Sequence, residues 1–178
     1  SNGYCSVMHD TDNDRIVISY LDGSDSWKGK VVVGTISGTS ISFGTPVEFH
    51  SSAVAAAHGA YVGSSKVVIA YQDSTGSYYS YAIVGTVDPS TNTMTFGTEV
   101  QFYAGYGNNP YVVYDSDNDK AVILYRDGHS GNDGTAIVGT VSGTSISFGS
   151  AVVFGSNGST YYHAGAYIGS SKIVVAFH

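Results

Sequence analysis

The chain has 178 residues, of which 42% are hydrophobic and only 12% are charged, and its formal net charge is -7. This length and hydrophobic content suffice for one domain with a buried core, and they exclude a disordered chain. Seven Lys and Arg against fourteen Asp and Glu exclude strong binding to nucleic acid, because affinity for a phosphate backbone comes from cationic side chains.

The sequence also argues against a membrane-spanning helix and against sites built from cysteines. No apolar run approaches the length of a membrane-spanning helix, so we expect no membrane insertion. Cys5 is the one cysteine of the chain, so neither an intrachain disulfide nor a zinc site made of cysteines can form. Gly and Tyr are abundant, with 23 and 15 copies, which is typical of a chain rich in β-strands and turns.

A unit of about fifty residues repeats along the chain. Its period is marked by three glycines, Gly34, Gly85 and Gly139, which occupy the same place in three similar segments. We treat the whole chain as a single repeat domain. Its copies cover residues 1–50, 51–103 and 104–155, and a half-copy covers 156–178.

Each copy divides into four β-prone runs separated by turn residues, and we name these runs A, B, C and D in chain order. Run B is apolar on both sides of the pleat. This pattern predicts an interior strand, because both faces of its sheet must then be covered. Run B occupies residues 15–20, 66–71, 120–125 and 172–177.

Run D alternates between apolar and polar residues, as in Met94, Thr95, Phe96 and Gly97 of the second copy. One face of such a strand is buried and the other meets water. In the first copy Pro46 stands at an outward position, and proline lacks the N–H that an interior strand donates. Run D is therefore predicted to be an edge strand.

Four-stranded antiparallel sheets that recur every fifty residues or so predict an all-β fold, a β-propeller-like array of blades. A stack of meanders is the main alternative. Three copies and an A–B hairpin cannot close a ring of whole blades. We therefore expect an incomplete array, or one closed by a second copy that pairs with the open edge in a homo-oligomer.

The third copy carries the phrase Ala-Ile-Val-Gly-Thr-Val-Ser-Gly-Thr-Ser-Ile-Ser-Phe-Gly at 136–149, with Lys-x-Val-x-x-Tyr-x-Asp upstream at 120–127. These motifs resemble repeats in propeller-like regions of marine phage tail-fibre proteins and large marine bacterial surface proteins. The resemblance covers nearly the whole chain. It implies a propeller-type fold and a binding role outside the cell or on the virion surface, without a defining catalytic motif.

Two acidic segments lie between runs A and B of the first and third copies. Alternating carboxylates can converge on a hard cation such as calcium, but the glycine and distal glutamate of an EF-hand loop are missing. The second and fourth copies carry Gly-Ser-Ser instead, so we predict turns and no bound metal or cofactor. The weak metal candidates are Asp10, Asp12, Asp14, Asp115, Asp117 and Asp119.

Asp22, Asp73 and Asp127 follow run B at equivalent positions. In a propeller they would form a ring of carboxylates on one face, which can bind a ligand rich in hydroxyl groups. Alternatively, each aspartate caps the turn into run C through its own backbone. The two interpretations are compatible, and the sequence leaves both open.

The loops between runs B and C vary most, as expected of a binding surface on a fixed frame. An aromatic ring stacks on the apolar face of a sugar, while Asn and His bond its hydroxyl groups. The alternative is that these rings cover a sheet edge. We expect glycan contact from Trp27, Tyr78, Tyr79, His129 and Asn132.

The remaining histidines and the repeated aromatic residues are expected to be structural. His58 and His163 lie in the A runs without a third ligand at metal-binding spacing, so we interpret them as strand residues whose hydrogen bonds are satisfied. The aromatic residue at the end of run B is predicted to lie in the core. It recurs as Tyr20, Tyr71, Tyr125 and Phe177.

We find no nucleophile elbow, phosphate-binding loop or His-Glu-x-x-His motif, which favours a protein that is not an enzyme. The sequence favours a recognition module for carbohydrate or a surface receptor, within a larger extracellular or phage fibre. A structural module that assembles with its own copies is the first alternative. The second is a fragment of a sialidase-like glycoside hydrolase, although the Ser-x-Asp-x-Gly-x-x-Trp box is missing.

Overall fold

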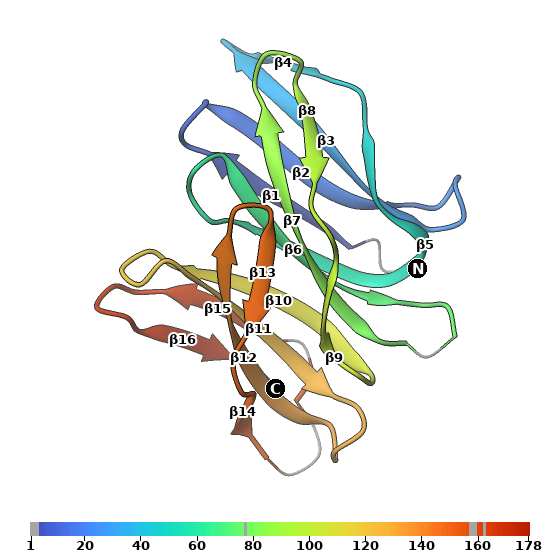
Figure 1. Cartoon of the computed structure of the whole chain (residues 1–178), viewed down its shortest axis with the longest axis vertical. Coiled ribbons are helices and arrows are strands. Elements are labelled where there is room, and N and C mark those ends of the chain that lie inside the picture. The colour runs from blue at the N-terminus through green and yellow to red at the C-terminus, as the bar shows by residue number, and fades with distance from the viewer. Residues whose placement is uncertain (1–3, 77, 157–159, 162) are drawn as a thin grey trace.

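The computed structural model describes residues 4–76, 78–156, 160–161 and 163–178. These residues form sixteen antiparallel strands in three sheets, so the predicted all-β class is confirmed (Figure 1). No helix among the described residues combines the length and the apolar character that crossing a membrane requires.

The largest sheet has nine strands and curls into a half-barrel. Its strands are β1 (Cys5–Asp10), β2 (Arg15–Asp22), β3 (Lys28–Ser37), β4 (Ser40–Phe43), β5 (Val47–Tyr61), β6 (Lys66–Asp73), β7 (Ser80–Asp88), β8 (Thr93–Phe96) and β9 (Val100–Tyr103). The second sheet has five strands: β10 (Gly107–Asp115), β11 (Lys120–Asp127), β12 (Asp133–Ser142), β13 (Ser145–Phe148) and β14 (Val152–Gly155). The third pairs β15 (Ala164–Tyr167) with β16 (Ile173–Ala176).

Each copy of the repeat forms an antiparallel meander of the four predicted runs. Runs A, B and C of the first copy are β1, β2 and β3, and those of the third copy are β10, β11 and β12. Run D is split into two short strands that both pair with run C, as β8 and β9 pair with β7. β8 and β9 have no second partner strand among the described residues, which agrees with the predicted edge position.

The first two copies are joined by one long strand, β5. Its first half pairs with β3, and its second half, from Val54 to Tyr61, pairs with β6. The pairing of β5 shifts register with β3 between Glu48 and Ala53, and with β6 between Val54 and Ala56. Such bulges bend a strand, so that one strand can pair with two differently oriented neighbours. The described residues therefore do not show the separate four-stranded blades of a propeller, and the boundary expected at residue 50 falls inside β5.

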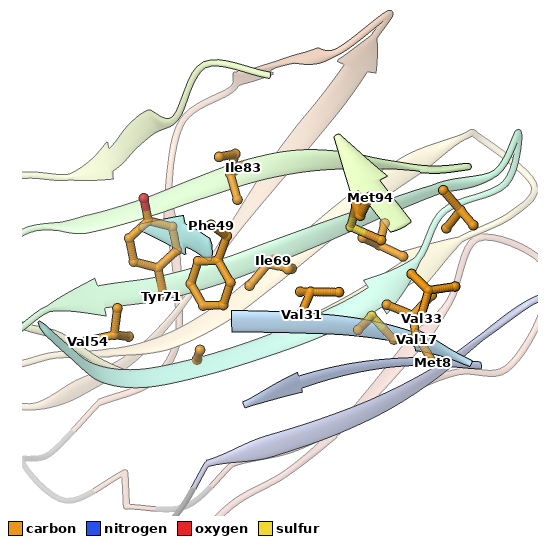
Figure 2. Packing of buried hydrophobic residues seen from close by; sticks show 13 residues of the cluster. Met8, Val17, Val31, Val33, Phe49, Val54, Ile69, Tyr71, Ile83 and Met94 are labelled. Atoms are coloured by element: carbon orange, nitrogen blue, oxygen red, sulfur yellow. The ribbon is translucent and has the colours of Figure 1, made fainter. Parts of the chain in front are cut away.

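The hydrophobic core lies between the sheets of consecutive copies. Alternate residues of β6 point in opposite directions: Ile69 and Tyr71 pack toward the first copy, whereas Val68 and Ala70 pack toward the third. Figure 2 shows the first of these layers, in which the Tyr71 and Phe49 rings lie 5.3 Å apart. Burying one such aliphatic side chain stabilises the fold by about 1.5–3 kcal/mol. The predicted interior position of run B is confirmed for β6.

The aromatic residues at the end of run B follow this layering. Tyr71 and Tyr125 are fully buried, as predicted. Tyr20 is only partly buried because it faces outward from the first copy, which has no earlier copy against it in the chain. Phe177 is 48% exposed, so the predicted core position is wrong there, because its two-stranded sheet has no run C beside it in the described residues.

The periodic glycines make room for the side chains of run D. A Cβ atom on Gly85 would lie 2.4 Å from the Met94 sulfur, and one on Gly34 would lie 2.8 Å from the Phe43 ring. Real Cβ atoms do not approach other atoms this closely. The glycine therefore recurs because the following short strand packs its apolar side chains directly over the backbone of run C.

Candidate binding edge at the B–C turns

The turns between runs B and C lie at one end of the sheets, and we call this end the B–C edge. It comprises the turns 23–27, 74–79 and 128–132. The starts of the A strands lie at the same edge, because Cys5 pairs with Tyr20 and Gly107 pairs with Asp127. The edge therefore brings together segments that are fifteen to twenty residues apart in the sequence.

Asp22, Asp73 and Asp127 each accept a hydrogen bond from a backbone N–H two residues later. The distances are 3.0 Å from Ser24 N, 2.7 Å from Thr75 N and 2.9 Å from His129 N. This is the Asx turn that aspartate favours, and it corresponds to the capping role anticipated for these positions. The carboxylates are therefore already engaged by their own turns.

In the first copy the aspartate also pairs with lysine. Lys30 Nζ lies 2.8 Å from both Asp22 Oδ2 and Asp25 Oδ2. Hydrogen bonds from Lys30 and Ser24 lower the pKa of Asp22 to about 2, and the two carboxylates raise the pKa of Lys30. Because Lys30 is shared by both carboxylates, each of them is already paired with a cation before a ligand binds.

A second polar cluster joins the first two copies beneath this edge. Tyr71 donates a hydrogen bond to Glu99 Oε2, which lies 3.0 Å from His50 Nδ1. The other ring nitrogen of His50 lies 3.7 Å from Asp73 Oδ2. Burial and the neighbouring Glu99 carboxylate raise the pKa of Tyr71. Because the Tyr71 side chain is fully buried, we interpret the cluster as a link between strands.

The next copy repeats this link in a simpler form. Tyr103 takes the place of His50 and donates a hydrogen bond to Asp127 Oδ1, while its ring packs 5.2 Å from that of Tyr125. Burial and the Asp127 carboxylate raise the pKa of Tyr103. Recurrence of the link at two junctions supports a structural role. No local motif predicts this link, because the two side chains come from different runs.

Exposed aromatic rings stack across the second and third copies at the B–C edge. The rings of Tyr78 and Tyr106 are 4.8 Å apart and nearly parallel, with 17° between their planes. The ring of His129 lies 5.6 Å from that of Tyr106 and is tilted by 55° against it. Tyr78 is 37% exposed and Tyr106 is 40% exposed. We call these three residues the aromatic platform.

The structure brings two of the predicted contact residues, Tyr78 and His129, into this platform. Tyr106 was missed, because it precedes β10 and belongs to no B–C turn. Tyr79 is also exposed at this edge. A tyrosine between two glycines, just before a β-prone run, was the available signal for Tyr106.

Trp27 and Asn132 lie at equivalent places just before run C, and neither belongs to the platform. Both have a positive φ, 61° and 64°. Their carbonyl oxygens accept hydrogen bonds from the next copy: Val54 N donates to Trp27, and Thr160 N donates to Asn132. The Trp27 ring is 43% exposed and covers Gly23, at 3.2 Å from the place of a Cβ atom there.

The acidic segments form turns that dock on the following copy. Asp10 accepts hydrogen bonds from Asp12 N at 3.1 Å and from the Asn13 amide at 2.8 Å. The same Asn13 amide also donates to Ser65 Oγ of the second copy, and Ser65 N donates to Asp12 Oδ2. Asp14 lies outside this contact and pairs with the exposed His9.

The third and fourth copies repeat this contact. Asn118 donates to Asp115 Oδ2 at 2.8 Å and to Ser171 Oγ at 2.6 Å, and Asp117 N donates to Asp115 Oδ1. Asp119 accepts a hydrogen bond from the Tyr114 hydroxyl. Within the described ranges, no three His, Cys, Asp or Glu side chains are grouped so that they could hold a metal ion.

Comparisons with models of known protein families, with curated proteins and with solved structures found no match to this chain. Function is therefore inferred from the contacts of the described residues alone. Those contacts single out the B–C edge, because its aromatic rings are exposed while most of its carboxylates are held by turns and cations.

Proposed function

We propose that the chain is a non-enzymatic recognition module that binds carbohydrate through the aromatic platform, within a larger extracellular or virion-surface fibre. The observation that carries this proposal is the exposed stack of Tyr78 on Tyr106, across two copies, with the tilted His129 ring beside it. A contiguous exposed apolar patch on a folded protein commonly marks a site for a ligand or a partner.

The chemistry of the platform suits a neutral sugar. An aromatic face packs against the C–H groups of a pyranose ring, and His129 offers a hydrogen bond to its hydroxyl groups. The nearby Asp127 carboxylate already accepts bonds from Tyr103 and from the turn. A ligand held mainly by ring stacking needs no counter-charge, which agrees with the low content of charged residues.

A glycan array probed with the whole chain tests this function, followed by titration of the best ligand. Tyr106→Ala removes the central ring and should weaken binding about tenfold, which corresponds to about 1.4 kcal/mol. The matched control is Phe43→Ala, which removes a ring that is 48% exposed on β4. β4 pairs with the end of β3 that lies away from the B–C edge. An equal loss in both variants, or no bound glycan, would refute the proposal.

We further propose that the copies build a propeller-like array. The A strands β1, β5 and β10 are neighbours in space, and the sheets pack face to face in the order of the copies. This is the arrangement expected around a common axis. A complete ring would need more copies of the repeat, from the same polypeptide or from a second one.

A second candidate function is structural, namely self-assembly through the outer face of β16. Val174 occupies the place of Val17, Val68 and Val122 in the earlier copies. Val17 and Val68 are fully buried and Val122 is 9% exposed, because each packs on the following copy, whereas Val174 is 51% exposed. A second copy of the chain suits this face, because it carries the same repeat that covers the equivalent valines.

Light scattering over a range of concentrations tests the second candidate. Self-assembly predicts a mass that rises with concentration for the unmodified chain and stays at one copy for Val174→Asp, since a charge would be buried in the contact. A constant monomer mass for the unmodified chain would refute it. The aromatic platform lies in turns outside β16, so this outcome leaves the carbohydrate proposal unaffected.

A further inference from the structure

The A strands of the first three copies and the segment before β15 surround a cavity of about 250 Å³. Each of the four copies contributes at least one side chain to its wall. Those that carry the argument are Tyr4, Cys5, His58, Asn109, Tyr111 and His163. Among the described residues that line it, none is Lys, Arg, Asp or Glu.

His58 is fixed in one neutral form at the wall of this cavity. Its Nδ1 accepts a hydrogen bond from Val112 N at 3.1 Å, and its ring stacks on Tyr111 with 3.9 Å between centroids. Burial lowers the pKa of His58 to about 4, with a smaller effect from the nearby His163. Because Nδ1 is an acceptor in the neutral ring, the proton is on Nε2, which is a hydrogen-bond donor.

His163 lines the same cavity, and neither of its ring nitrogens makes a well-formed hydrogen bond within the chain. The residue is only 7% exposed, yet neither Nδ1 nor Nε2 makes a hydrogen bond of acceptable geometry. Burial lowers its pKa, although the carbonyls of Leu124 and Asn109 lie near enough to oppose this. A buried imidazole without well-formed hydrogen bonds is costly, and the hydroxyl group of a bound molecule would supply them. The predicted satisfied state of this histidine is met only by these two carbonyls, which lie outside good hydrogen-bond geometry.

The backbone of β10 is irregular at the cavity. The pairing of β10 with β11 shifts register between Asn108 and Tyr111, and Asn109 has a φ of 51°. The side-chain amide oxygen of Asn109 accepts a hydrogen bond from the Tyr4 hydroxyl at 2.8 Å. Bulges and left-handed residues re-aim side chains and gather at binding sites. This irregularity is independent of the unpartnered histidine.

We propose that this cavity binds one neutral sugar ring, or a polyol of similar size. The inference rests on the proposed carbohydrate function and deepens it, because it adds a site for one ring of the glycan. Tyr106 of the platform is three residues before Asn109, so the two sites lie along one segment at the start of β10.

Size and polarity select this class of ligand. The cavity is smaller than the roughly 300–1,000 Å³ typical of sites for drug-sized molecules, so it suits a single ring. The Nε2–H of His58 donates, and neutral His163 both donates and accepts, which matches the two roles of a hydroxyl group. A charged ligand would lose its hydration without gaining a counter-charge from the described residues of the wall, none of which is Lys, Arg, Asp or Glu.

The test follows the imidazole signals of the whole chain by NMR during titration with methyl glycosides of glucose, galactose, mannose and N-acetylglucosamine. Glucuronate is the charged comparison. We expect at least one neutral glycoside to shift the His58 and His163 signals saturably, and glucuronate to leave them in place. Single histidine substitutions assign the signals. Absence of a saturable shift with every neutral glycoside would overturn the inference.

His163→Leu separates binding from folding. It removes both unpartnered nitrogens, so binding to the cavity should weaken at least tenfold while the melting temperature rises by about 2–4 °C. A histidine needed only for the fold would give the opposite change in melting temperature. If His163→Leu does not fold, His163→Gln serves instead and should retain a weakened shift at His58. An unchanged affinity in the variant that folds would overturn the inference.

Tyr106→Ala keeps the two proposals apart. If this variant loses array binding while the glycoside still shifts His163, both proposals stand. If the array signal depends on Tyr106 and no glycoside shifts either imidazole, the cavity inference fails alone. If glycosides shift His163 but the array signal is unaffected by Tyr106→Ala, the platform proposal fails alone.

Discussion

Gly97 tests whether consecutive copies are held in contact by glycine. It follows β8, and a Cβ atom there would lie 1.8 Å from the carbonyl oxygen of Thr144 in the next copy. The first copy repeats this contact, with 2.0 Å between a Cβ atom on Gly44 and the Asn92 carbonyl oxygen. The third copy provides the control, because the nearest atom to a Cβ on Gly149 is 3.9 Å away.

The expected magnitude follows from these distances. In Gly97→Ala the new methyl group and the Thr144 carbonyl must separate by about 1.6 Å to reach ordinary contact, from 1.8 Å to 3.4 Å. Overpacking of this kind costs about 1–3 kcal/mol. In Gly149→Ala no separation is needed. Both changes also restrict the unfolded chain, which stabilises the fold by about 0.4–1 kcal/mol in each.

The difference between the two variants therefore isolates the contact between copies. We expect Gly97→Ala to be less stable than Gly149→Ala by about 1–3 kcal/mol, with a melting temperature lower by about 2–4 °C for each kcal/mol. Circular dichroism during thermal and urea denaturation measures both. Equal stabilities would show that the second and third copies are not in the contact described, and the stacking of sheets would then need revision.

Two further predictions concern the A strands and the acidic turns. Because the folded pKa of His58 is about 4 and the ordinary value is 6.5, the unfolded chain binds the proton first, so the free energy of unfolding should fall by about 3 kcal/mol between pH 7 and pH 4. Urea denaturation at several pH values measures this, and an equal slope in His58→Asn would contradict it. Asn13→Ala should cost about 1 kcal/mol, because its amide bonds both Asp10 and Ser65, whereas Ser116→Ala in the equivalent turn should change stability by less than about 0.5 kcal/mol. The same denaturation assay compares them, and a similar loss in both would argue against a role for the Asn13 amide.

The strands were predictable because run B is apolar on both faces, and this pattern has one stable solution, a sheet covered on both sides. The continuity of β5 was not anticipated. Its sequence nevertheless contains the reason, since residues 47–58 include neither glycine nor proline. The corresponding passage from the second to the third copy has Gly105, Gly107 and Pro110, and there the sheets separate.

The candidate site was predictable only where one turn contains the whole interaction. Asp22 and its counterparts bond their own backbone two residues later, which is a local property that aspartate carries in any turn. The stack of Tyr78 on Tyr106 depends on how two copies pack, and the unpartnered state of His163 depends on the packing of all four. Neither arrangement is encoded in a local motif, so the sequence alone could not reveal it.

The distribution of interactions also bears on the kind of ligand. At the B–C edge the Asp22 carboxylate binds its own turn and Lys30, and the Asp127 carboxylate accepts a hydrogen bond from Tyr103. These carboxylates therefore already have partners within the fold. What remains exposed there is aromatic and neutral. In this repeat the acidic side chains form contacts within the fold, whereas aromatic rings are exposed. Such a surface selects ligands by shape and stacking, and a neutral glycan is the class of ligand that it recognises best.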